Sequence, residues 1–254
     1  MIHSTAIVSP KAKLGVNVQV GPFAIIDETA VIGDNCVIGP RAHLEYCVIG
    51  PDNQVGEGAL IGAPPQDLKY KNEPTSVAVG SGNVFREYVT IHRATHAGES
   101  TKVGDRCFFM ANAHVAHDCT VGSQVILVNG VAIGGHCTVY DQAFLSAFVA
   151  VHQFCRIGRN AMIGANLKLS KDIPPFVTVG GDDDGIHGLN KVGLKRAGFT
   201  RERINILENL YSIYFREKLM VSEAVKKIEM TLPQNDDVRA FLDFIKNSKR
   251  GIER

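Results

Sequence analysis

A single period runs through residues 103–170, VGDRCFFMANAHVAHDCTVGSQVILVNGVAIGGHCTVYDQAFLSAFVAVHQFCRIGRNAMIGANLKLS, where every sixth side chain is large and apolar. The series consists of Val103, Phe109, Val115, Val121, Leu127, Ile133, Val139, Leu145, Val151, Ile157, Ile163 and Leu169. We extend it by one more step to Pro175. An amphipathic helix repeats at three and four residues and a half-buried strand at two, so neither gives this period. The pattern therefore predicts a solenoid of short flat strands joined by tight corners.

The same period begins close to the N-terminus. Aliphatic side chains recur every six residues from Ile2 to Leu44, and after a slip of one residue the series resumes at Ile49 and again at Val79. A small residue follows four places after most of them, which suits a narrow core in a chain with 7% aromatic residues and no Trp. Gly and Asn are expected to supply the positive φ that a sharp corner requires.

Most of the six cysteines fall in this small-residue slot, at Cys36, Cys107, Cys119, Cys137 and Cys155. Cysteine behaves as a small apolar residue when it is buried. We therefore expect free thiols in the core of a protein from a reducing compartment, not a disulfide framework.

Two segments interrupt the count, at about 63–78 and 93–102, and they are expected to loop out of the coil. Loops that leave a rigid scaffold commonly carry binding groups. The repeat fades after Pro174 and Pro175, and residues 180–188 read as a polar, acidic connector.

A helical pattern follows from about Asn190, with a possible cap at Ser222 for its second helix. Its apolar stripes are Ile204, Leu207, Tyr211 and Tyr214, then Val225 and Ile228, then Val238, Phe241, Phe244 and Ile245. The sequence thus predicts a mainly β protein, with a β-helical domain over residues 1–189 and a small α-helical domain over residues 190–254.

Charge and hydropathy exclude several classes of protein. The formal net charge is only +1, and the basic excess of the C-terminal segment is too dilute to indicate nucleic-acid binding. The first residues, Met1 to Lys13, lack the pattern of a signal peptide, and no apolar stretch approaches the length of a membrane span. A cytoplasmic protein is expected.

Polar residues that could carry chemistry gather within three successive coils: His114, His117, Asp118, His136 and His152. The inward positions of these coils are occupied by other residues, so these side chains should point outward or lie at a corner. A single histidine there could be an ordinary surface residue, but a cluster favours a site. Neutral histidine is well suited to removing a hydroxyl proton near neutral pH.

Strict repeats of six residues resemble the hexapeptide-repeat family, whose fold is a left-handed parallel β-helix with three short strands per coil. Several motifs further resemble the UDP-N-acetylglucosamine O-acyltransferase family. They are Pro65-Gln66-Asp67-Leu68-Lys69-Tyr70, Thr90-Ile91-His92-Arg93, His114-Val-Ala-His117-Asp118, Gly134-Gly135-His136, Val151-His152-Gln153-Phe154 and Gly193-Leu194-Lys195-Arg196. The resemblance implies a homotrimer that moves an (R)-3-hydroxyacyl chain from acyl carrier protein to the 3-position of UDP-N-acetylglucosamine, the first step of lipid A biosynthesis. It implies no metal or other cofactor.

The resemblance also implies roles for individual residues. His117 would be the general base, Asp118 would orient it, and the backbone N–H of Gly135 would stabilise the oxyanion. Substrate-binding residues would be Gln66, Asp67, Lys69, His92, His114, His136, His152, Gln153, Asn190 and Arg196. Without the resemblance, Lys69 and Arg196 read equally as exposed surface residues. Ala165 would set the depth of the acyl groove and leave room for a fairly long chain.

The chain departs from the family pattern near the expected nucleotide site, at Val192, Ala197 and the loop Asp182-Asp183-Asp184. The acceptor could therefore be the 3-amino analogue of the sugar nucleotide, which would give an amide and not an ester. The related N-acyltransferase usually carries a domain ahead of the coils, whereas the repeats here begin at Ile2.

Two other classes remain open alternatives. One is a trimeric metalloenzyme of the carbonic anhydrase type, in which histidines bind a zinc-like ion. The other is a β-helical scaffold without catalysis, which does not account for polar residues gathered in three coils. The two loops and the basic helical tail favour the acyltransferase over both.

Overall fold

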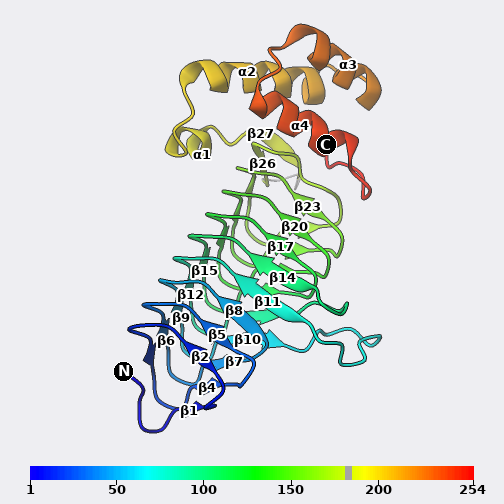
Figure 1. The fold of residues 1–254 in the computed structure, drawn as a ribbon. Coiled ribbons are helices and arrows are strands. Elements are labelled where there is room, and N and C mark those ends of the chain that lie inside the picture. Colours follow the sequence, from blue (N-terminus) through cyan, green and yellow to red (C-terminus); the bar gives the residue numbers. More distant parts are fainter. Residues whose placement is uncertain (181–184) are drawn as a thin grey trace.

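The computed structural model describes residues 1–180 and 185–254 of the chain. They form a column of short strands, with helices stacked on one end and the N-terminus at the other (Figure 1). The prediction of a left-handed parallel β-helix followed by helices is confirmed. The acidic stretch Asp182–Asp184 of the predicted connector lies outside the described residues.

Three sheets form the sides of the column, and successive strands from β1 to β25 occupy them in turn. Sheet I contains β1 (Ile7–Val8), β4 (Ile25–Ile26), β7 (His43–Leu44), β10 (Leu60–Ala63), β13 (Thr90–His92), β16 (His114–Val115), β19 (Ala132–Ile133), β22 (Ala150–Val151) and β25 (Lys168–Leu169). Sheet II contains β2 (Lys13–Leu14), β5 (Val31–Ile32), β8 (Cys47–Ile49), β11 (Ser76–Val79), β14 (Ser100–Val103), β17 (Thr120–Val121), β20 (Thr138–Val139) and β23 (Arg156–Ile157). Sheet III contains β3 (Gln19–Val20), β6 (Val37–Ile38), β9 (Gln54–Val55), β12 (Val84–Phe85), β15 (Phe108–Phe109), β18 (Ile126–Leu127), β21 (Phe144–Leu145), β24 (Met162–Ile163), β26 (Val177–Val179) and β27 (Ile186–Leu189).

Stacking of the coils follows the sequence period. In sheet I, Val115 lies beside Ile133, Ile133 beside Val151, and Val151 beside Leu169. Within the uninterrupted coils, residues 18 positions apart therefore lie one above the other, as the linked Gln124 and Gln142 side chains also do. Residues of like chemistry at this spacing form columns along the outside of the prism.

One residue at each corner adopts the left-handed backbone conformation. Between residues 106 and 166, a positive φ of 53–68° recurs at every sixth position, at Arg106, Asn112, Asp118, Gln124, Gly130, His136, Gln142, Phe148, Phe154, Asn160 and Asn166. Only one of these corner residues is glycine. The expectation that Gly or Asn supplies the corners was therefore too narrow, because stacking of the coils imposes this conformation on larger side chains too.

Most glycines of the repeat have a different purpose, which is close approach between coils. A Cβ on Gly134 would lie 2.8 Å from both the Gln153 nitrogen and the Val151 oxygen of the next coil. A Cβ on Gly122 would lie 2.8 Å from the Asp141 nitrogen. These distances are shorter than real Cβ contacts, so the spacing of the strands excludes a side chain at these positions.

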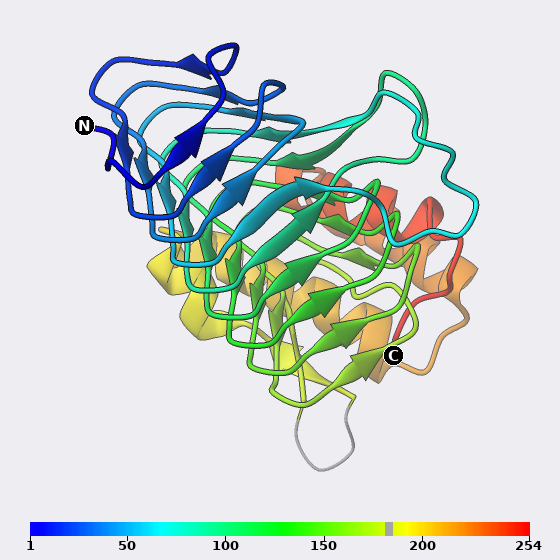
Figure 2. The same cartoon turned by 90° about the horizontal axis from the view of Figure 1, so that it is seen from below.

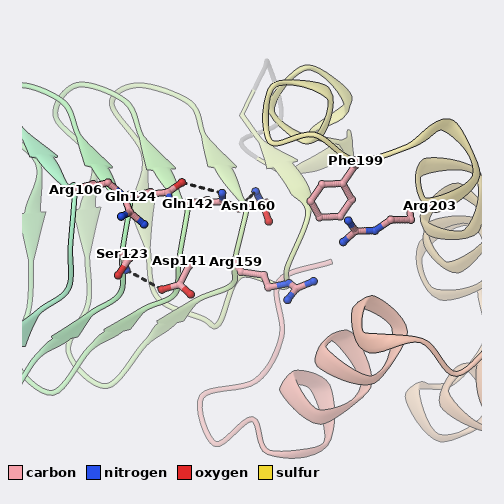
Figure 3. A pocket seen from close by; sticks show the side chains of 9 residues that line it. All are labelled: Arg106, Ser123, Gln124, Asp141, Gln142, Arg159, Asn160, Phe199 and Arg203. Carbon is pink, nitrogen blue, oxygen red and sulfur yellow. Dashed lines mark hydrogen bonds between the residues drawn. The ribbon is translucent and has the colours of Figure 1, made fainter.

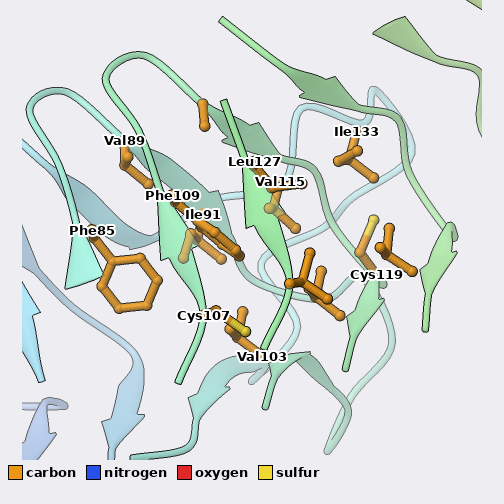
Figure 4. Packing of buried hydrophobic residues seen from close by; sticks show 14 of the residues in the cluster. Phe85, Val89, Ile91, Val103, Cys107, Phe109, Val115, Cys119, Leu127 and Ile133 are labelled. Carbon is orange, nitrogen blue, oxygen red and sulfur yellow. The ribbon is translucent and has the colours of Figure 1, made fainter. Parts of the chain in front are cut away.

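The interior of the prism is filled by the predicted apolar series. Phe85 and Phe109 meet edge to face with their ring centroids 5.3 Å apart, and aliphatic and cysteine side chains fill the space around them (Figure 4). All six cysteines are buried and unpaired, as predicted. Burial raises the pKa of Cys107 to about 11, so this thiol stays protonated near neutral pH.

Both predicted loop insertions leave the coil, over a slightly shorter range than expected. Residues 64–75 connect β10 to β11, and residues 93–99 connect β13 to β14. The predicted boundaries were too wide because Ser76 pairs with Ser100 and Ala78 with Lys102 in sheet II. The two loops project together from one side of the column, and the Gly98 N–H donates to the Pro74 carbonyl at 2.9 Å (Figure 2).

A pair of fully buried asparagines joins the coils where these insertions disturb the spacing. The Asn53 side-chain amide donates to the Gly50 and Gly80 carbonyls at 2.7 and 2.8 Å. Its oxygen accepts from the Asn83 backbone and side chain, and the Asn83 oxygen accepts from the Cys107 N–H. These bonds hold three coils in register in place of an apolar contact.

The last coil of the β-helix, which ends with β26 paired in parallel with β24, is shorter than the sequence period indicated. Ile173 bridges to Ile157 and fills the last inward position of sheet II, so the extension of the series to Pro175 was wrong. The residues predicted as a connector are partly a strand, because β27 pairs antiparallel with β26.

Helices cover this end of the column: α1 (Lys191–Arg196), α2 (Arg201–Tyr211), a π-helical turn (Ser212–Arg216), α3 (Val221–Thr231) and α4 (Asp236–Lys246). The predicted stripes of α2 and α4 are buried, as is Ile228 of α3. The prediction of Ser222 as an N-cap was wrong, because Ser222 lies inside α3. The helix begins at Val221, and Met220 is its N-cap. None of the helices in the described ranges has the length and apolarity to span a membrane.

Replacement of Asn53 by Ala is expected to destabilise the fold by about 3 kcal/mol, since it leaves buried amide and carbonyl groups unpaired. Urea unfolding of the purified protein measures this loss. The matched control is Asn205→Ala on the exposed side of α2, which should change the free energy of unfolding little. Equal effects of both substitutions would contradict a special role for the buried pair.

Candidate active site

The corner between sheets I and II holds a hydrogen-bonded His–Asp pair. His117 Nδ1 lies 2.7 Å from Asp118 Oδ2, and both side chains are largely buried. Adjacent residues can meet in this way because Asp118 is a corner residue with a φ of 60°. An ionised carboxylate only accepts hydrogen bonds, so Nδ1 carries the proton and Nε2 keeps its lone pair.

The second loop and β14 fix Asp118 through two residues that sequence reasoning missed, Thr95 and Thr101. The Thr95 N–H and hydroxyl donate to the two Asp118 oxygens at 2.9 and 2.8 Å, and the Asp118 N–H donates to Thr101 Oγ1. Burial tends to raise the pKa of Asp118. The hydrogen bonds from Thr95 and His117, together with nearby His136, outweigh it and hold that pKa below its usual value. Asp118 therefore remains an anion beside His117.

Gly135 lies directly against the free edge of the His117 ring. A Cβ on Gly135 would lie 2.7 Å from His117 Cε1 and 2.8 Å from Nε2, so only glycine leaves room for this imidazole. At two equivalent corners, the N–H of Ser81 donates to Asp105 and that of Ser123 to Asp141 of the following coil. Among the described residues, no such acceptor takes the Gly135 N–H. A free donor thus lies beside a free acceptor.

His136 completes the corner one coil above Asp118. Its Nε2 lies 3.5 Å from Asp118 Oδ2, and its ring stacks on Phe154 with centroids 4.7 Å apart. The predicted residues His152 and Gln153 follow in the next coil and are exposed. The structure therefore brings His117, Asp118, Gly135 and His136 together, with His152 and Gln153 continuing the same corner.

Two further predicted histidines lie on the adjoining face. His92 and His114 meet edge to face at 5.2 Å, and Thr90 Oγ1 lies 2.7 Å from His114 Nδ1. Burial, with the nearby His92 and His117, lowers the pKa of His114 to about 4. Burial likewise lowers the pKa of His92, whose Nδ1 lies 2.7 Å from the Pro64 carbonyl. Both rings are neutral near pH 7, which permits them to lie close together.

The first loop places its predicted residues at an exposed tip. Gln66 and Lys69 are exposed, and Leu68 between them is fully so. Asp67 accepts the Lys69 N–H at 2.9 Å and so organises the turn itself. These side chains project from the column, and the loop is joined to the histidines by the hydrogen bond of 2.7 Å between His92 Nδ1 and the Pro64 carbonyl.

Asn190 and Arg196 line a separate cavity of about 550 Å³ between α1 and the outer face of sheet III. Asn190 also caps α1 by accepting the Gly193 N–H, and it donates to the Asn160 carbonyl. Val192 and Ala197 line the same cavity. In a three-sided prism, sheet III lies opposite the corner of His117, so one chain does not bring these two groups of residues together.

A second hollow lies at the corner of sheets II and III and is strongly polar (Figure 3). Arg159 and Arg203 line this hollow, and both guanidinium groups pair with the buried carboxylate of Asp237. Its floor is a ladder of amides, Gln124, Gln142 and Asn160, that bond to one another. Asp237 of α4 thereby joins the helices to the β-helix through Arg159, whereas the amides link successive coils of the β-helix.

The corner of sheets I and II, which carries His117, also has a set of side chains that could bind a metal ion. One ligand atom each from His117, Asp118 and His136 lies within 4.8 Å of the others. In the observed arrangement, however, His117 Nδ1 faces Asp118, and the carboxylate accepts three hydrogen bonds from Thr95 and His117. A cation at these atoms would have to replace those bonds, so the donor set fits a His–Asp dyad better.

Sequence profiles agree with the class that the fold and corner define, the hexapeptide-repeat transferases. The profile described as bacterial transferase hexapeptide (six repeats) matches residues 11–45, 29–63 and 100–135. A second profile, described as Udp N-acetylglucosamine O-acyltransferase, domain 2, matches residues 172–253. The chain belongs to the family of acyl-[acyl-carrier-protein]–UDP-N-acetylglucosamine O-acyltransferases, as its full-length relatives show.

One such relative, from Thermodesulfovibrio yellowstonii, is 46% identical over 100% of this chain and 99% of its own length. Another, from Sulfurihydrogenibium sp., is 51% identical over 99% of this chain and 93% of its own. Among solved structures, a UDP-N-acetylglucosamine acyltransferase from Bacteroides fragilis matches all of both chains, with a TM-score of 0.97 and 42% identity. The enzyme from Campylobacter jejuni gives a TM-score of 0.93 at 32% identity, covering 100% of this chain and 99% of its own.

The lowered pKa of His114 predicts a pH-dependent stability. In the unfolded chain this imidazole takes up a proton near its ordinary pKa of 6.5, whereas in the folded protein it does so only near 4. The unfolded state therefore binds more protons in this window, and stability falls as the pH drops from 6.5 to 4. Urea unfolding at pH 7 and pH 4.5 should show a smaller acid-induced loss for His114→Gln than for the unaltered protein. His3→Gln, at the exposed N-terminal end, should leave the loss unchanged.

Proposed function

We propose that this protein transfers an (R)-3-hydroxyacyl chain from acyl carrier protein to the 3-hydroxyl of UDP-N-acetylglucosamine, as the first step of lipid A biosynthesis. The observation that carries the proposal is the His117–Asp118 pair, whose ring lies against Gly135, a residue whose N–H has no acceptor among the described residues. A base and an anion-binding donor side by side suit attack of a hydroxyl on a thioester. Family membership supplies the substrates.

In the proposed mechanism, His117 Nε2 removes the proton from the sugar hydroxyl as its oxygen attacks the thioester carbonyl. The Asp118 carboxylate stabilises the imidazolium that forms, since its low pKa keeps it ionised. The Gly135 N–H donates to the carbonyl oxygen as it gains negative charge. Collapse of the intermediate breaks the C–S bond, and the imidazolium returns the proton to the departing thiolate. No covalent acyl-enzyme is required.

The other predicted residues would bind the substrate around this centre. His92 and His114 are neutral and offer directional hydrogen bonds without attracting a competing anion. His136, His152 and Gln153 continue the corner beside His117. We assign Gln66, Asp67 and Lys69 to the sugar and phosphates, since Gln66 and Lys69 are exposed on the loop. We assign Asn190 with Arg196 to the nucleotide end, since both line the cavity beside α1.

We infer a homotrimer from the arrangement of these groups. The His117 corner and the Asn190–Arg196 cavity lie on opposite sides of one prism, and the loop with Leu68 projects away from it. A single substrate could reach all three only where one protomer meets the next. We further propose acyl carrier protein as the partner that donates the acyl chain, and the cytoplasm as the location. The proposed reaction needs no metal or other cofactor, and we assign the chain no nucleic-acid partner.

Ala165 is proposed to limit the acyl chain. It is exposed at the corner between sheets III and I, next to the corner residue Asn166. Its small side chain would leave space for a fairly long chain. We also propose that residues 1–189 and 190–254 act as two domains, the first carrying the chemistry and the second the nucleotide end.

The 3-amino sugar nucleotide is the second candidate acceptor. Val192 and Ala197 line the cavity with Asn190 and Arg196, and neither can offer the charged contact that the family pattern has there. An amine could be acylated by the same base and donor, so the chemistry at the corner would not change.

Acyl transfer by chelator-treated protein tests the proposal against its rivals. With hydroxyacyl carrier protein as donor, we expect product with UDP-N-acetylglucosamine. Product with the 3-amino analogue alone would move the specificity to the amide-forming reaction. Activity that is lost on chelation and restored by zinc would favour a metal enzyme, and inactivity with both acceptors would contradict the proposed function.

Replacement of His117 by Ala is expected to lower kcat about a thousandfold, because general-base assistance is lost. His3→Ala, at the N-terminal end, is the matched control and should retain full activity. Thermal unfolding and size-exclusion chromatography should show both variants folded. Substantial turnover by a folded His117→Ala variant would exclude His117 as the base.

A further inference from the structure

The chain beyond α4 returns to the β-helix. The Asp172 N–H donates to the Gly251 carbonyl at 2.9 Å, and the Glu253 N–H donates to the Asp172 carbonyl at 3.0 Å. Ile252 thereby forms a parallel bridge with Asp172, while Ser248 Oγ donates to the Asp172 carboxylate at 2.8 Å. This short tail is fixed on the last coil, so the residue between these contacts has a defined place.

That residue is Arg250, and it lies against the corner that carries His152. Its Nη2 is 3.2 Å from the Ser170 carbonyl and 3.1 Å from His152 Nδ1. Its Nε is buried and has no hydrogen-bond partner among the described residues. A guanidinium is always protonated and only donates. The contact with His152 is therefore a hydrogen bond only if Nδ1 is unprotonated.

A second neighbour of the same ring atom has the opposite requirement. His152 Nδ1 also lies 3.1 Å from the carbonyl oxygen of Gln153, which can only accept. A proton on Nδ1 would satisfy Gln153 and oppose Arg250, whereas a lone pair would do the reverse. The hydrogen-bond partner of one ring nitrogen decides which nitrogen carries the proton. Arg250 and Gln153 thus compete for the tautomer of His152.

We propose that Arg250 is a positioning residue that holds His152 with its proton on Nε2. The cationic donor is the stronger partner, since charge-assisted hydrogen bonds exceed neutral ones. Nε2–H then donates toward the substrate, to a phosphate or acyl oxygen. Without Arg250, the Gln153 carbonyl captures Nδ1–H and Nε2 becomes an acceptor. This inference rests on the proposed function for the use of His152, but the tautomer itself does not depend on it.

The tautomer can be measured directly in the folded, substrate-free protein. Magic-angle-spinning NMR of ¹⁵N-histidine-labelled protein distinguishes protonated from unprotonated ring nitrogens, and the His152 signals are assigned by their loss in His152→Ala. We expect Nε2–H in the unaltered protein and in Lys249→Met, which removes a neighbouring exposed charge. Arg250→Met should shift the population to Nδ1–H, and Arg250→Lys should retain Nε2–H in part. An unchanged tautomer in a folded Arg250→Met variant would overturn the proposal.

Kinetics of acyl transfer supply a second readout, since a positioning role must act through His152. Arg250→Met should lower kcat/KM about tenfold, mainly through KM, as expected for one lost hydrogen bond. In a His152→Ala background the same substitution should have no further effect, whereas independent, additive losses would contradict the link. If no acyl transfer occurs with either acceptor, the proposed function fails while the NMR result still decides the role of Arg250.

Discussion

The site and the coils around it depend on one backbone constraint, a left-handed residue at every sixth position between residues 106 and 166. Each such residue turns the chain from one sheet to the next, and the turn brings the following coil within hydrogen-bonding distance of the previous one. Because the corner residue and the one before it cannot point inward, they form the outer edges of the prism. His117, Asp118, Gly135 and His136 occupy these two positions in neighbouring coils. The geometry that makes the fold regular therefore also exposes its chemistry.

A regular scaffold alone would leave the dyad unsupported, and the second loop supplies what the repeat lacks. Thr95 presents two donors to Asp118, and Thr101 fixes the Asp118 backbone. The carboxylate is held in one orientation and kept ionised, which in turn determines the tautomer of His117. The insertion thus acts on the site through an uncharged side chain that is hydrogen-bonded to Asp118.

The sequence was sufficient for the β-helix because its apolar period is longer and stricter than any helix or hairpin produces. The dyad was equally accessible, since His117 and Asp118 are neighbours in a regular coil. Thr95 was not, because insertions have no defined phase and their contacts cannot be counted from the repeat. Pro175 continued the numerical period, yet the last coil is shorter and Ile173 fills the inward position. Local helix signals likewise placed a cap at Ser222, although the chain turns two residues earlier. Several predicted substrate-binding residues could be located by their motifs, but only the structure reveals that they lie on opposite faces.

Columnar stacking has a consequence for how such a chain can change in length. A deletion of one residue between Asp118 and Gly135 would shift every later side chain by one position in the repeat and separate the members of the corner. Removal or duplication of a complete coil near the N-terminus would leave the alignment of His117, Gly135 and Gln153 intact, because their columns are defined relative to their immediate neighbours. The length of such a chain can therefore change only by complete coils. The number of N-terminal coils can vary without altering the site formed by the later coils.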